Sequence, residues 1–491
     1  MFDIAVIFAP ANIFFTFLGT LIGVTVGAIP GITTTMTIAL FLPFTFGMAP
    51  ISSFGLLLGI YAGGQFGGSI AAILINTPGT PSSTATVLDG YPMAQQGKGL
   101  EALSTAVISS FVGGIFSCFI LIVFASRLAQ ITLQFGPAEY FAVGVFALSI
   151  VANLSADNLI KGFISANIGL LLATIGMDPI TGAIRLTFGY RAMIGGIHFI
   201  AALTGLFAIC EVISKLEKKD KAIDNVAEIS GKMVSLSTLK ANTFNFIRSC
   251  IIGVIVGVTP GTGGSTAAWL SYNEAKRGSK NKESFGKGNV EGVVAPETAN
   301  SALTGGCLVP VLTLGIPGDA ATAVILGAFM IHGLTPGLGL FTNHPEVVTG
   351  IYTMLILSNI FVLVLGLGGA RLFAKVLQIP TNILMPLVFI ICLTGAYASN
   401  LSIFNMQVAF VLGVFAYILK KADFPIPPIL LGIILQPIIE ANFRRALTMS
   451  HGSFAIFLRP ISLLFLSISV AAFLFPIISA QYYRYKNNST A

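Results

Sequence analysis

The sequence predicts an all-helical protein that spans the membrane many times, in about 10–12 membrane segments arranged as two related halves. Of the 491 residues, 55% are hydrophobic and only 9% are charged, and the mean hydropathy is +0.90. Soluble globular chains carry about 25% charged residues, so these charges are too few to cover a water-exposed surface. Unbroken apolar stretches such as 102–125 and 347–370 reach the roughly 20 residues that a spanning helix needs.

The charge pattern predicts how the chain is divided. Basic residues gather between Lys215 and Glu291, mixed with acidic ones, as in a cytoplasmic loop of a membrane protein rather than a nucleic-acid-binding surface. We therefore expect a first transmembrane half over 1–213, a basic cytoplasmic loop over 214–248 and a second transmembrane half over 249–491. The start of the chain lacks the basic residues of a cleaved signal peptide, so the first apolar segment is expected to stay in the membrane.

Pro-Gly pairs occur in the same order in both halves. The segment Gly-Val-Thr-Val-Gly-Ala-Ile-Pro-Gly at 23–31 matches Gly-Val-Ile-Val-Gly-Val-Thr-Pro-Gly at 253–261 in six of nine positions. A second pair follows a double glycine (67–68 or 305–306) and a short apolar run in each half, at Pro78-Gly79 and at Pro317-Gly318. Because proline lacks an N–H and glycine exposes the backbone, these pairs are expected to break helices in a duplicated, inverted repeat. Close packing of small residues is the alternative explanation.

Basic residues also flank the segment 249–272, with Arg248 before it and Lys276-Arg277 after it. With a Pro-Gly pair at its centre, this segment is expected to form a re-entrant hairpin that enters and leaves on the cytoplasmic face. A plain spanning helix is the alternative. In an inverted first half, the corresponding hairpin over 23–47 enters from outside.

Small hydroxyl or polar residues follow each Pro-Gly pair, and none of the four segments contains Lys or Arg. A half-helix that begins there presents free N–H groups and the positive end of its dipole, which bind carboxylates without a cationic side chain. For each hydroxyl, a bond to the carbonyl four residues earlier is the alternative role. The predicted substrate-binding residues are Pro30, Gly31, Thr33, Thr34, Asn76, Thr77, Pro78, Gly79, Thr80, Pro260, Gly261, Thr262, Gly263, Ser265, Pro317 and Gly318.

Ionisable residues inside apolar stretches are candidates for binding a coupling cation, because a charge in the membrane is costly and is kept for a function. The predicted coupling-ion residues are Asp319, Glu297 and Asn300. For Asp319 the alternative role is a helix N-cap. Asp89 is expected to be an ordinary loop residue. The sequence has no metal-ligand spacing and no catalytic or nucleotide-binding motif, so we expect no metal, no cofactor and no catalytic residue.

Four strings of the sequence form a more specific pattern. They are Gly-Gly-Ser-Ile-Ala-Ala-Ile-Leu-Ile-Asn-Thr-Pro-Gly at 67–79, Asp-Gly-Tyr-Pro-Met-Ala at 89–94, Ala-Pro-Glu-Thr-Ala-Asn-Ser-Ala at 295–302 and Leu-Gly-Ile-Pro-Gly at 314–318. Together they resemble the large membrane subunit of the tripartite tricarboxylate transporters, the TctA family, over nearly the whole chain. Two equivalent positions depart from the family pattern, which has an acidic residue in place of Thr80 and a small hydroxyl residue in place of Asp319.

The resemblance implies a bacterial inner-membrane permease subunit that imports tricarboxylates or other organic carboxylates, such as citrate, together with a cation, Na⁺ or H⁺. It also implies two partners, a small membrane subunit and a periplasmic substrate-binding protein. We therefore expect a secondary transporter in the lipid bilayer, not an enzyme. Two alternatives stay open, namely an anion channel and a membrane-embedded enzyme that acts on a lipid substrate.

Overall fold

The computed structural model describes residues 4–131, 134–154, 159–217, 227, 229–377, 381–398 and 401–472. Six of its helical stretches are long and apolar enough to cross a membrane: Pro10–Ala28, Pro50–Ile75, Pro81–Ile131, Phe199–Glu217, Pro345–Gly369 and Ile403–Lys421. Seven shorter apolar helices accompany them among the described residues. The predicted all-helical, multi-pass architecture is confirmed.

The chain forms two compact units. Unit 1 comprises Met1–Gln130 and Phe207–Leu401, and unit 2 comprises Ile131–Leu206 and Ser402–Ala491. Both Pro-Gly repeats therefore lie in unit 1. The predicted division of the chain into 1–213, 214–248 and 249–491 describes duplication and topology rather than compactness, and it stays a prediction.

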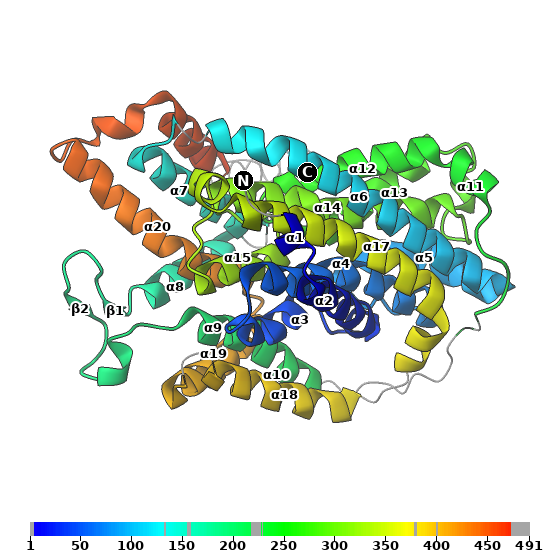
Figure 1. Cartoon of the computed structure of the whole chain (residues 1–491), viewed down its shortest axis with the longest axis horizontal. Helices are drawn as coiled ribbons and strands as arrows, with labels where there is room; N and C mark the ends of the chain where they lie inside the picture. Colours follow the sequence, from blue (N-terminus) through cyan, green and yellow to red (C-terminus); the bar gives the residue numbers. More distant parts are fainter. Residues whose placement is uncertain are drawn as a thin grey trace, which may run out of the picture. The chain divides into compact units, whose positions relative to one another are not determined.

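Unit 1 holds most of the helices (Figure 1). They are α1 (Ile4–Ile7), α2 (Pro10–Ala28), α3 (Thr34–Phe41), η1 (Leu42–Thr45), α4 (Pro50–Ile75), η2 (Pro81–Ser83), α5 (Thr84–Met93), η3 (Ala94–Lys98), α6 (Gly99–Ile131), α10 (Cys210–Glu217), α11 (Leu236–Ala241), α12 (Thr243–Val258), α13 (Gly263–Gly278), η7 (Lys282–Ser284), α14 (Glu291–Leu314), α15 (Ala320–Ile331), α16 (Leu338–Asn343), α17 (Pro345–Val376) and α18 (Thr381–Ala398). Helices α2, α4 and α17 begin with proline, whose missing N–H costs nothing in a first helical turn.

Helices α2 and α4 of the first half pack side by side (Figure 1). Gly19 lies against the backbone of Leu56, and Gly27 lies against the backbone of Gly64, so the two helices advance in the same direction. A Cβ atom at Gly27 would stand 2.9 Å from the carbonyl oxygen of Gly64. The small residues of α2 thus allow this close approach. Between the two helices the chain breaks at Pro30-Gly31 and continues in α3.

The second half repeats this arrangement. Gly253 lies against the backbone of Ala299, and Gly257 lies against the backbone of Leu303, so α12 and α14 also run in the same direction. Between them the chain turns back, since the hydroxyl of Ser271 in α13 donates to Ser249 Oγ in α12 at 2.8 Å. The segment 249–272 is therefore a helical hairpin and not one continuous helix, whereas its entry and exit on the cytoplasmic face stay a prediction.

The two halves meet with opposite chain directions. Ser69 of α4 pairs with Glu297 of α14, and Gln65, one turn earlier in α4, pairs with Asn300, almost one turn later in α14. Helices α4 and α14 are therefore antiparallel where they touch. This is the direction change that inverted repeats require, and the inverted relation of the complete halves stays a prediction.

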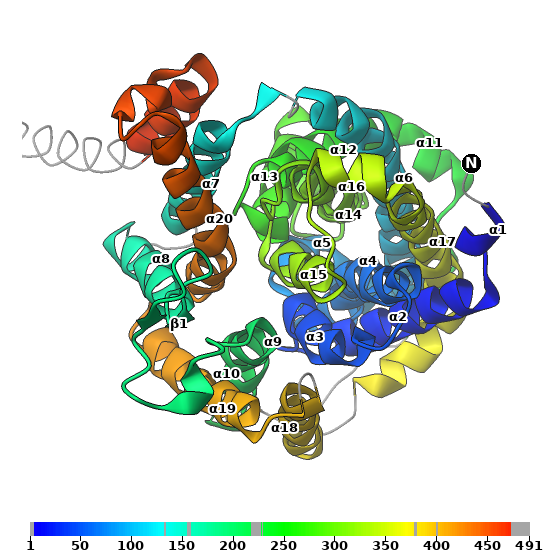
Figure 2. The same cartoon turned by 60° about the vertical axis from the view of Figure 1, so that its left-hand side comes forward.

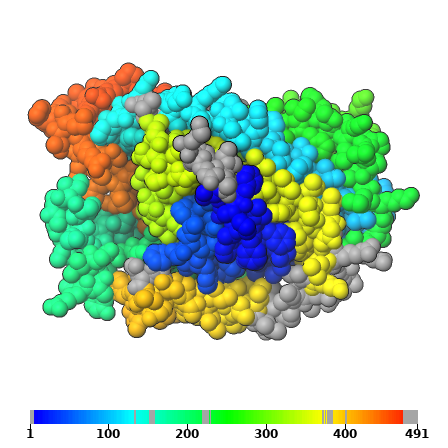
Figure 3. Space-filling model, in the orientation of Figure 1, coloured from blue at the N-terminus to red at the C-terminus, as the bar shows by residue number. Residues whose placement is uncertain are grey.

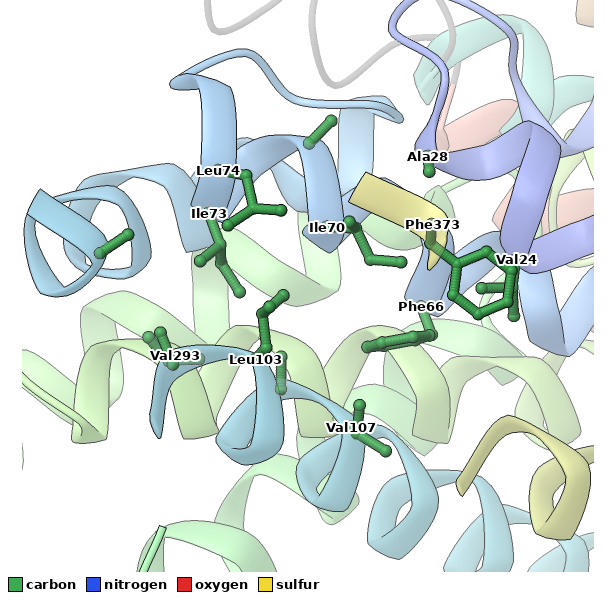
Figure 4. Packing of buried hydrophobic residues seen from close by; sticks show 14 of the residues in the cluster. Val24, Ala28, Phe66, Ile70, Ile73, Leu74, Leu103, Val107, Val293 and Phe373 are labelled. Carbon is green, nitrogen blue, oxygen red and sulfur yellow. The ribbon is translucent and has the colours of Figure 1, made fainter. Parts of the chain in front are cut away.

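A buried apolar cluster lies between α2, α4, α6, α14 and α17 of unit 1 (Figure 4). The cluster includes Val24, Ala28, Phe66, Ile70, Ile73, Leu74, Leu103, Val107, Val293 and Phe373. It joins residues of both halves in one core. On the face drawn in Figure 3, α2 (dark blue) lies beside α17 (yellow), in agreement with their packing contacts.

Unit 2 contains α7 (Pro137–Leu154), α8 (Leu159–Ala173), β1 (Gly176–Met177), β2 (Ile184–Arg185), η5 (Arg191–Met193), α9 (Phe199–Leu203), α19 (Ile403–Lys421), α20 (Pro427–Met449) and η8 (Phe454–Leu458), and η6 (Thr204–Ile209) joins α9 to α10. The two short strands pair antiparallel. Gly169 lies against the backbone of Ile429, and Gly432 lies against the backbone of Ala166, so α8 and α20 pack closely and antiparallel.

Charged side chains tie the loop between α8 and α9 to α20. Arg185 Nη1 lies 2.9 Å from Glu440 Oε1, and Arg444 Nη1 lies 2.9 Å from Asp178 Oδ2. The backbone N–H of Ile180 and then the Arg444 guanidinium hold the pKa of Asp178 well below its usual range, against the opposing effect of burial. Asp178 is therefore a carboxylate that the folded state stabilises in its ionised form.

Candidate functional site

The two Pro-Gly pairs of the first half touch each other. Gly31 has φ +83°, and its N–H donates to the carbonyl oxygen of Gly79 at 3.4 Å. The N–H of Gly79 in turn donates to Gly68 O of α4 at 3.1 Å. A side chain at Gly79 would overlap the carbonyl oxygen of Gly27. Glycine is thus required at this break by the close approach of three backbone segments.

The two Pro-Gly pairs of the second half form the same contact. The N–H of Gly261, also with φ +83°, donates to the carbonyl oxygen of Gly318 at 2.7 Å. A Cβ atom at Gly318 would stand 2.5 Å from Gly257 O and 2.7 Å from Cys307 Sγ. The predicted equivalence of the breaks in the two halves therefore agrees with their geometry.

One detail of the predicted repeat is wrong. The double glycines 67–68 and 305–306 do not occupy the same positions. Gly68 of the first half and Cys307 of the second are the residues beside the second Pro-Gly pair. Val24 and Val254 are equivalent in the repeat, and Gly67 lies against Val24 while Gly306 lies against Val254. Gly67 therefore corresponds to Gly306 and not to Gly305. The two double glycines are therefore shifted by one residue relative to each other, in agreement with their spacing from the second Pro-Gly pair, since Gly68 precedes Pro78 by 10 positions and Gly306 precedes Pro317 by 11.

The halves also exchange contacts at their breaks (Figure 2). Helix α3, which follows the first break, packs against α15, which follows the fourth. Helix α13, which follows the third break, packs against η2 and α5, which follow the second. All four predicted breaks thus belong to one connected region of unit 1, here called the break region. Four helix N-termini start in it, the feature that suits an anionic ligand.

The predicted binding residues differ in their positions. The buried members of the set are Thr34, Gly79, Thr80, Pro260, Pro317 and Gly318. Asn76 and Thr77 are exposed at the end of α4, where Asn76 adopts the left-handed conformation with φ +56°. The residues that are partly buried are Pro30, Gly31, Thr33, Pro78, Gly261, Thr262, Gly263 and Ser265. The buried pair Thr80 and Thr34 is therefore more central than Asn76 and Thr77.

Asp319 forms a helix cap. Its Oδ1 accepts the N–H of Thr322 at 2.8 Å, and the hydroxyl of Thr322 faces the backbone N–H of Asp319 at 3.0 Å, which makes a capping box. Its Oδ2 accepts the hydroxyl of the buried Tyr61 at 2.9 Å. Both carboxylate oxygens therefore already have donors. This geometry is that of the capping alternative, and a role in ion binding stays a prediction.

Glu297 is fully buried and surrounded by hydroxyl groups. Its Oε1 accepts Ser69 Oγ and Thr86 Oγ1, both at 2.5 Å, and its Oε2 accepts Ser110 Oγ at 3.2 Å. These donors come from α4, α5 and α6. Among the described residues no Lys, Arg or His pairs with Glu297. A carboxylate in such a place calls for a bound cation or a proton.

Asn300 lies almost one turn after Glu297, at the contact between α4 and α14. Its Nδ2 donates to the main-chain oxygen of Gln65 at 3.2 Å, whereas its Oδ1 has no hydrogen-bond partner among the described residues. The same holds for the buried Thr34 Oγ1. Buried polar atoms normally have partners, so these two oxygens are candidates for contact with a ligand.

Two residues of unit 1 that were not among the predicted site residues make notable contacts. The first is Lys215 of α10, because a Cβ atom at Gly31 would overlap its ammonium nitrogen. The four Pro-Gly segments themselves contain no Lys or Arg, but the tertiary structure brings Lys215, from a helix far along the chain, to the first break. In the sequence Lys215 follows a long apolar segment, and nothing near it in the sequence predicts its contact with Gly31.

The second is Asp89, which is fully buried in α5 and is not a loop residue. Its Oδ1 accepts the N–H groups of Gly286, Gly288 and Asn289 at 2.8–3.0 Å. Its Oδ2 accepts the hydroxyl of Tyr272 at 2.8 Å. Asp89 therefore fastens the loop after α13 to α5. The apolar helix pattern around residue 89 is interrupted by Gly90 and Pro92, which is why the sequence suggested a loop.

The segments 229–235 and 286–289 lie at the same end of unit 1. Ser230 Oγ donates to Gly97 O at 3.3 Å, and Gln96 Nε2 donates to Lys287 O at 2.8 Å. Both segments thus contact the short turn around Gly97. This agrees with the prediction that the loops before α12 and after α13 share one side of the membrane. The assignment of that side to the cytoplasm stays a prediction.

Comparison with known proteins adds independent information. The chain matches the tripartite tricarboxylate transporter TctA family over residues 13–431. It is 37% identical over 463 residues to an uncharacterised 52.8 kDa protein from the TAR-I ttuC′ 3′ region of Agrobacterium vitis, covering 94% of this chain and 92% of the relative. An uncharacterised protein from the TAR-II ttuC′ 3′ region of the same organism is 37% identical over 205 residues, which cover 42% of this chain and 85% of the relative. No solved structure matches the chain.

Proposed function

Because the chain belongs to the tripartite tricarboxylate transporter TctA family and is a multi-pass membrane protein, we propose that it imports an organic carboxylate by cation-coupled secondary transport across the bacterial inner membrane. In this proposal it is the permease of a three-component system. A periplasmic binding protein delivers the substrate, and a small membrane subunit completes the complex. The substrate is a tricarboxylate such as citrate or a related carboxylate.

The paired breaks are the observation that carries this proposal. In each half a backbone hydrogen bond joins the two Pro-Gly pairs, Gly31 to Gly79 and Gly261 to Gly318. Helices α3, α5, α13 and α15 begin beside these bonds, so several positive dipole ends face one region, and α13, which has no side-chain cap, also offers its first N–H groups to a multiply charged anion. Broken helices in repeated halves are typical of transporter binding sites. Lys215 beside Gly31 adds a positive charge at the first break.

The coupling cation is proposed to bind at Glu297. Three hydroxyl groups at 2.5–3.2 Å orient its carboxylate, and a Na⁺ ion or a proton would compensate its charge. Substrate and cation sites are then close together, because Asn300 follows Glu297 on α14 and faces the break region. Asp319 is expected to serve as a cap, as its geometry indicates.

Counter-flow in proteoliposomes tests the proposal. Liposomes that hold the permease and the small subunit are loaded with unlabelled citrate and receive labelled citrate outside, with the binding protein. A secondary transporter accumulates the label by exchange, whereas a channel only equilibrates it and an enzyme does not move it. Failure to exchange any of citrate, malate or succinate would contradict the proposed function.

A variant of Glu297 tests the coupling site. Glu297→Gln keeps the size of the side chain and imitates its protonated form. We expect it to exchange substrate in counter-flow but to lose accumulation driven by a Na⁺ or pH gradient. The matched control is Glu101→Gln, a partly buried carboxylate in α6, which should accumulate substrate normally. Gradient-driven uptake by Glu297→Gln at the wild-type level would refute this assignment.

A further inference from the structure

Asn300 presents a hydrogen-bond acceptor without a donor at the contact between the two halves. Its side chain is 0% exposed, and its Nδ2 donates to Gln65 O at 3.2 Å. Turning the amide by 180° would place Oδ1 against the Gln65 oxygen, so two acceptors would face each other. The orientation of the amide is therefore determined by its one hydrogen bond. Oδ1 is left without a donor among the described residues.

The unpartnered oxygen points to the beginning of α13. A Cβ atom at Gly264 would stand 2.5 Å from Asn300 Oδ1 and 3.0 Å from Ser82 Cβ. The absence of a side chain at Gly264 thus leaves Oδ1 facing the first turn of this 16-residue helix. No side chain caps α13, since Thr262 makes no cap bond, so its first N–H groups are available to an anion.

The electrostatics of this position select the kind of donor. A cation could coordinate Asn300 Oδ1, but the positive end of the α13 dipole disfavours a cation there and favours an anion. A hydroxyl group on the anion itself satisfies both requirements, because the carboxylate meets the N–H groups while the hydroxyl donates to Oδ1. The nearby hydroxyl of Ser82 does not supply the donor, because it donates to Gln65 Oε1 at 3.2 Å.

We propose that Asn300 is a specificity residue that accepts a hydrogen bond from a hydroxyl group of the substrate, so that the transporter selects hydroxycarboxylates over the same carboxylates without the hydroxyl. This inference rests on the proposed function, because it requires a carboxylate in the break region. It assigns Asn300 to the substrate rather than to the coupling ion.

Two pairs of probes test this selection directly. Malate and succinate differ by one hydroxyl, and so do citrate and propane-1,2,3-tricarboxylate. Competition binding on the full-length chain with its small subunit in detergent avoids the selectivity of the binding protein. We expect the hydroxylated member of each pair to bind at least about tenfold more tightly, since a site built for a hydroxyl rejects the analogue that lacks it.

Asn300→Leu removes the acceptor at similar size, and its preference for the hydroxylated probes should fall to within about twofold. The matched control is Asn359→Leu, which removes another buried amide, on α17, whose Nδ2 donates to Leu355 O at 2.8 Å. The control should keep the wild-type preference. If Asn300→Leu does not fold, Gly264→Ala replaces it, because its methyl group would occupy the space in front of Oδ1.

Each outcome decides the question. Equal wild-type affinity for both members of each pair overturns this inference and leaves the proposed function intact, because carboxylates still bind. A tenfold preference that persists in Asn300→Leu or Gly264→Ala also overturns it, as does a change in Na⁺ affinity without a change in preference. If none of the four probes binds and none is exchanged in counter-flow, the proposed function itself fails.

Discussion

Replacing Asp319 by Asn distinguishes a helix cap from an ion site. Asparagine is as good an N-cap as aspartate, so its oxygen can still accept the N–H of Thr322. What changes is the bond from Tyr61, because a hydrogen bond to a charged acceptor contributes roughly 1.5–3 kcal/mol and one between neutral groups roughly 0.5–1.5 kcal/mol. We therefore expect Asp319→Asn to destabilise the protein by about 1 kcal/mol, with unchanged dependence of uptake on the driving cation.

The larger change Asp319→Ala should destabilise the protein more than Asp319→Asn does. It removes the cap, worth about 1 kcal/mol, and leaves the hydroxyl of buried Tyr61 without its acceptor, which costs about 1–3 kcal/mol. The expected total is about 2–4 kcal/mol. Tyr61→Phe removes the other partner of this hydrogen bond. The double variant Asp319→Ala/Tyr61→Phe should therefore lose less stability than the sum of the two single variants, since both delete the same bond.

Unfolding in detergent and uptake at varied Na⁺ concentration and pH measure the two effects separately. If Asp319 is a cap, the stability of Asp319→Asn should lie between that of wild type and that of Asp319→Ala. The same variant should also transport substrate with the wild-type dependence on the cation. A stable Asp319→Asn variant that loses cation coupling would refute the reasoning, and so would equal stability of the Asn and Ala variants.

Four further results are expected. Gly318→Ala should destabilise the protein by about 1–3 kcal/mol or prevent insertion, because its methyl group meets backbone at 2.5 Å, whereas Gly47→Ala, with open space around it, should be neutral in the same unfolding assay. Lys215→Met should weaken carboxylate binding about fivefold in competition assays, the effect of one partly exposed charge, and unchanged affinity would exclude Lys215 from the anion site. The depressed pKa of Asp178 contributes stability above its unfolded pKa of about 3.9 that is lost as the pH falls towards its folded value, so Asp178→Asn should flatten the acid limb of stability between pH 5 and 3, and an unaltered limb would contradict this. Uptake from low external substrate should need the binding protein, and high-affinity uptake by the purified chain in liposomes would disprove that dependence.

Local chemistry explains which features could be predicted from the sequence. The apolar stretches, the four helix breaks and the hairpin formed by α12 and α13 follow from hydropathy and from the backbone properties of proline and glycine, which act within a few residues. The equivalence of the two Pro-Gly sets also follows from their order. For Asp319, the sequence already offered the cap, because a capping aspartate is recognised by its position before a helix.

Tertiary structure alone decided which distant groups surround each site residue. The hydroxyls around Glu297 come from three other helices, Lys215 reaches Gly31 from α10, and Asp89 holds a loop almost two hundred positions away in the chain. The register of α4 against α14 likewise leaves Asn300 Oδ1 without a donor. Such contacts depend on how whole helices pack and in which direction they run, and a residue's sequence neighbours carry no record of that packing.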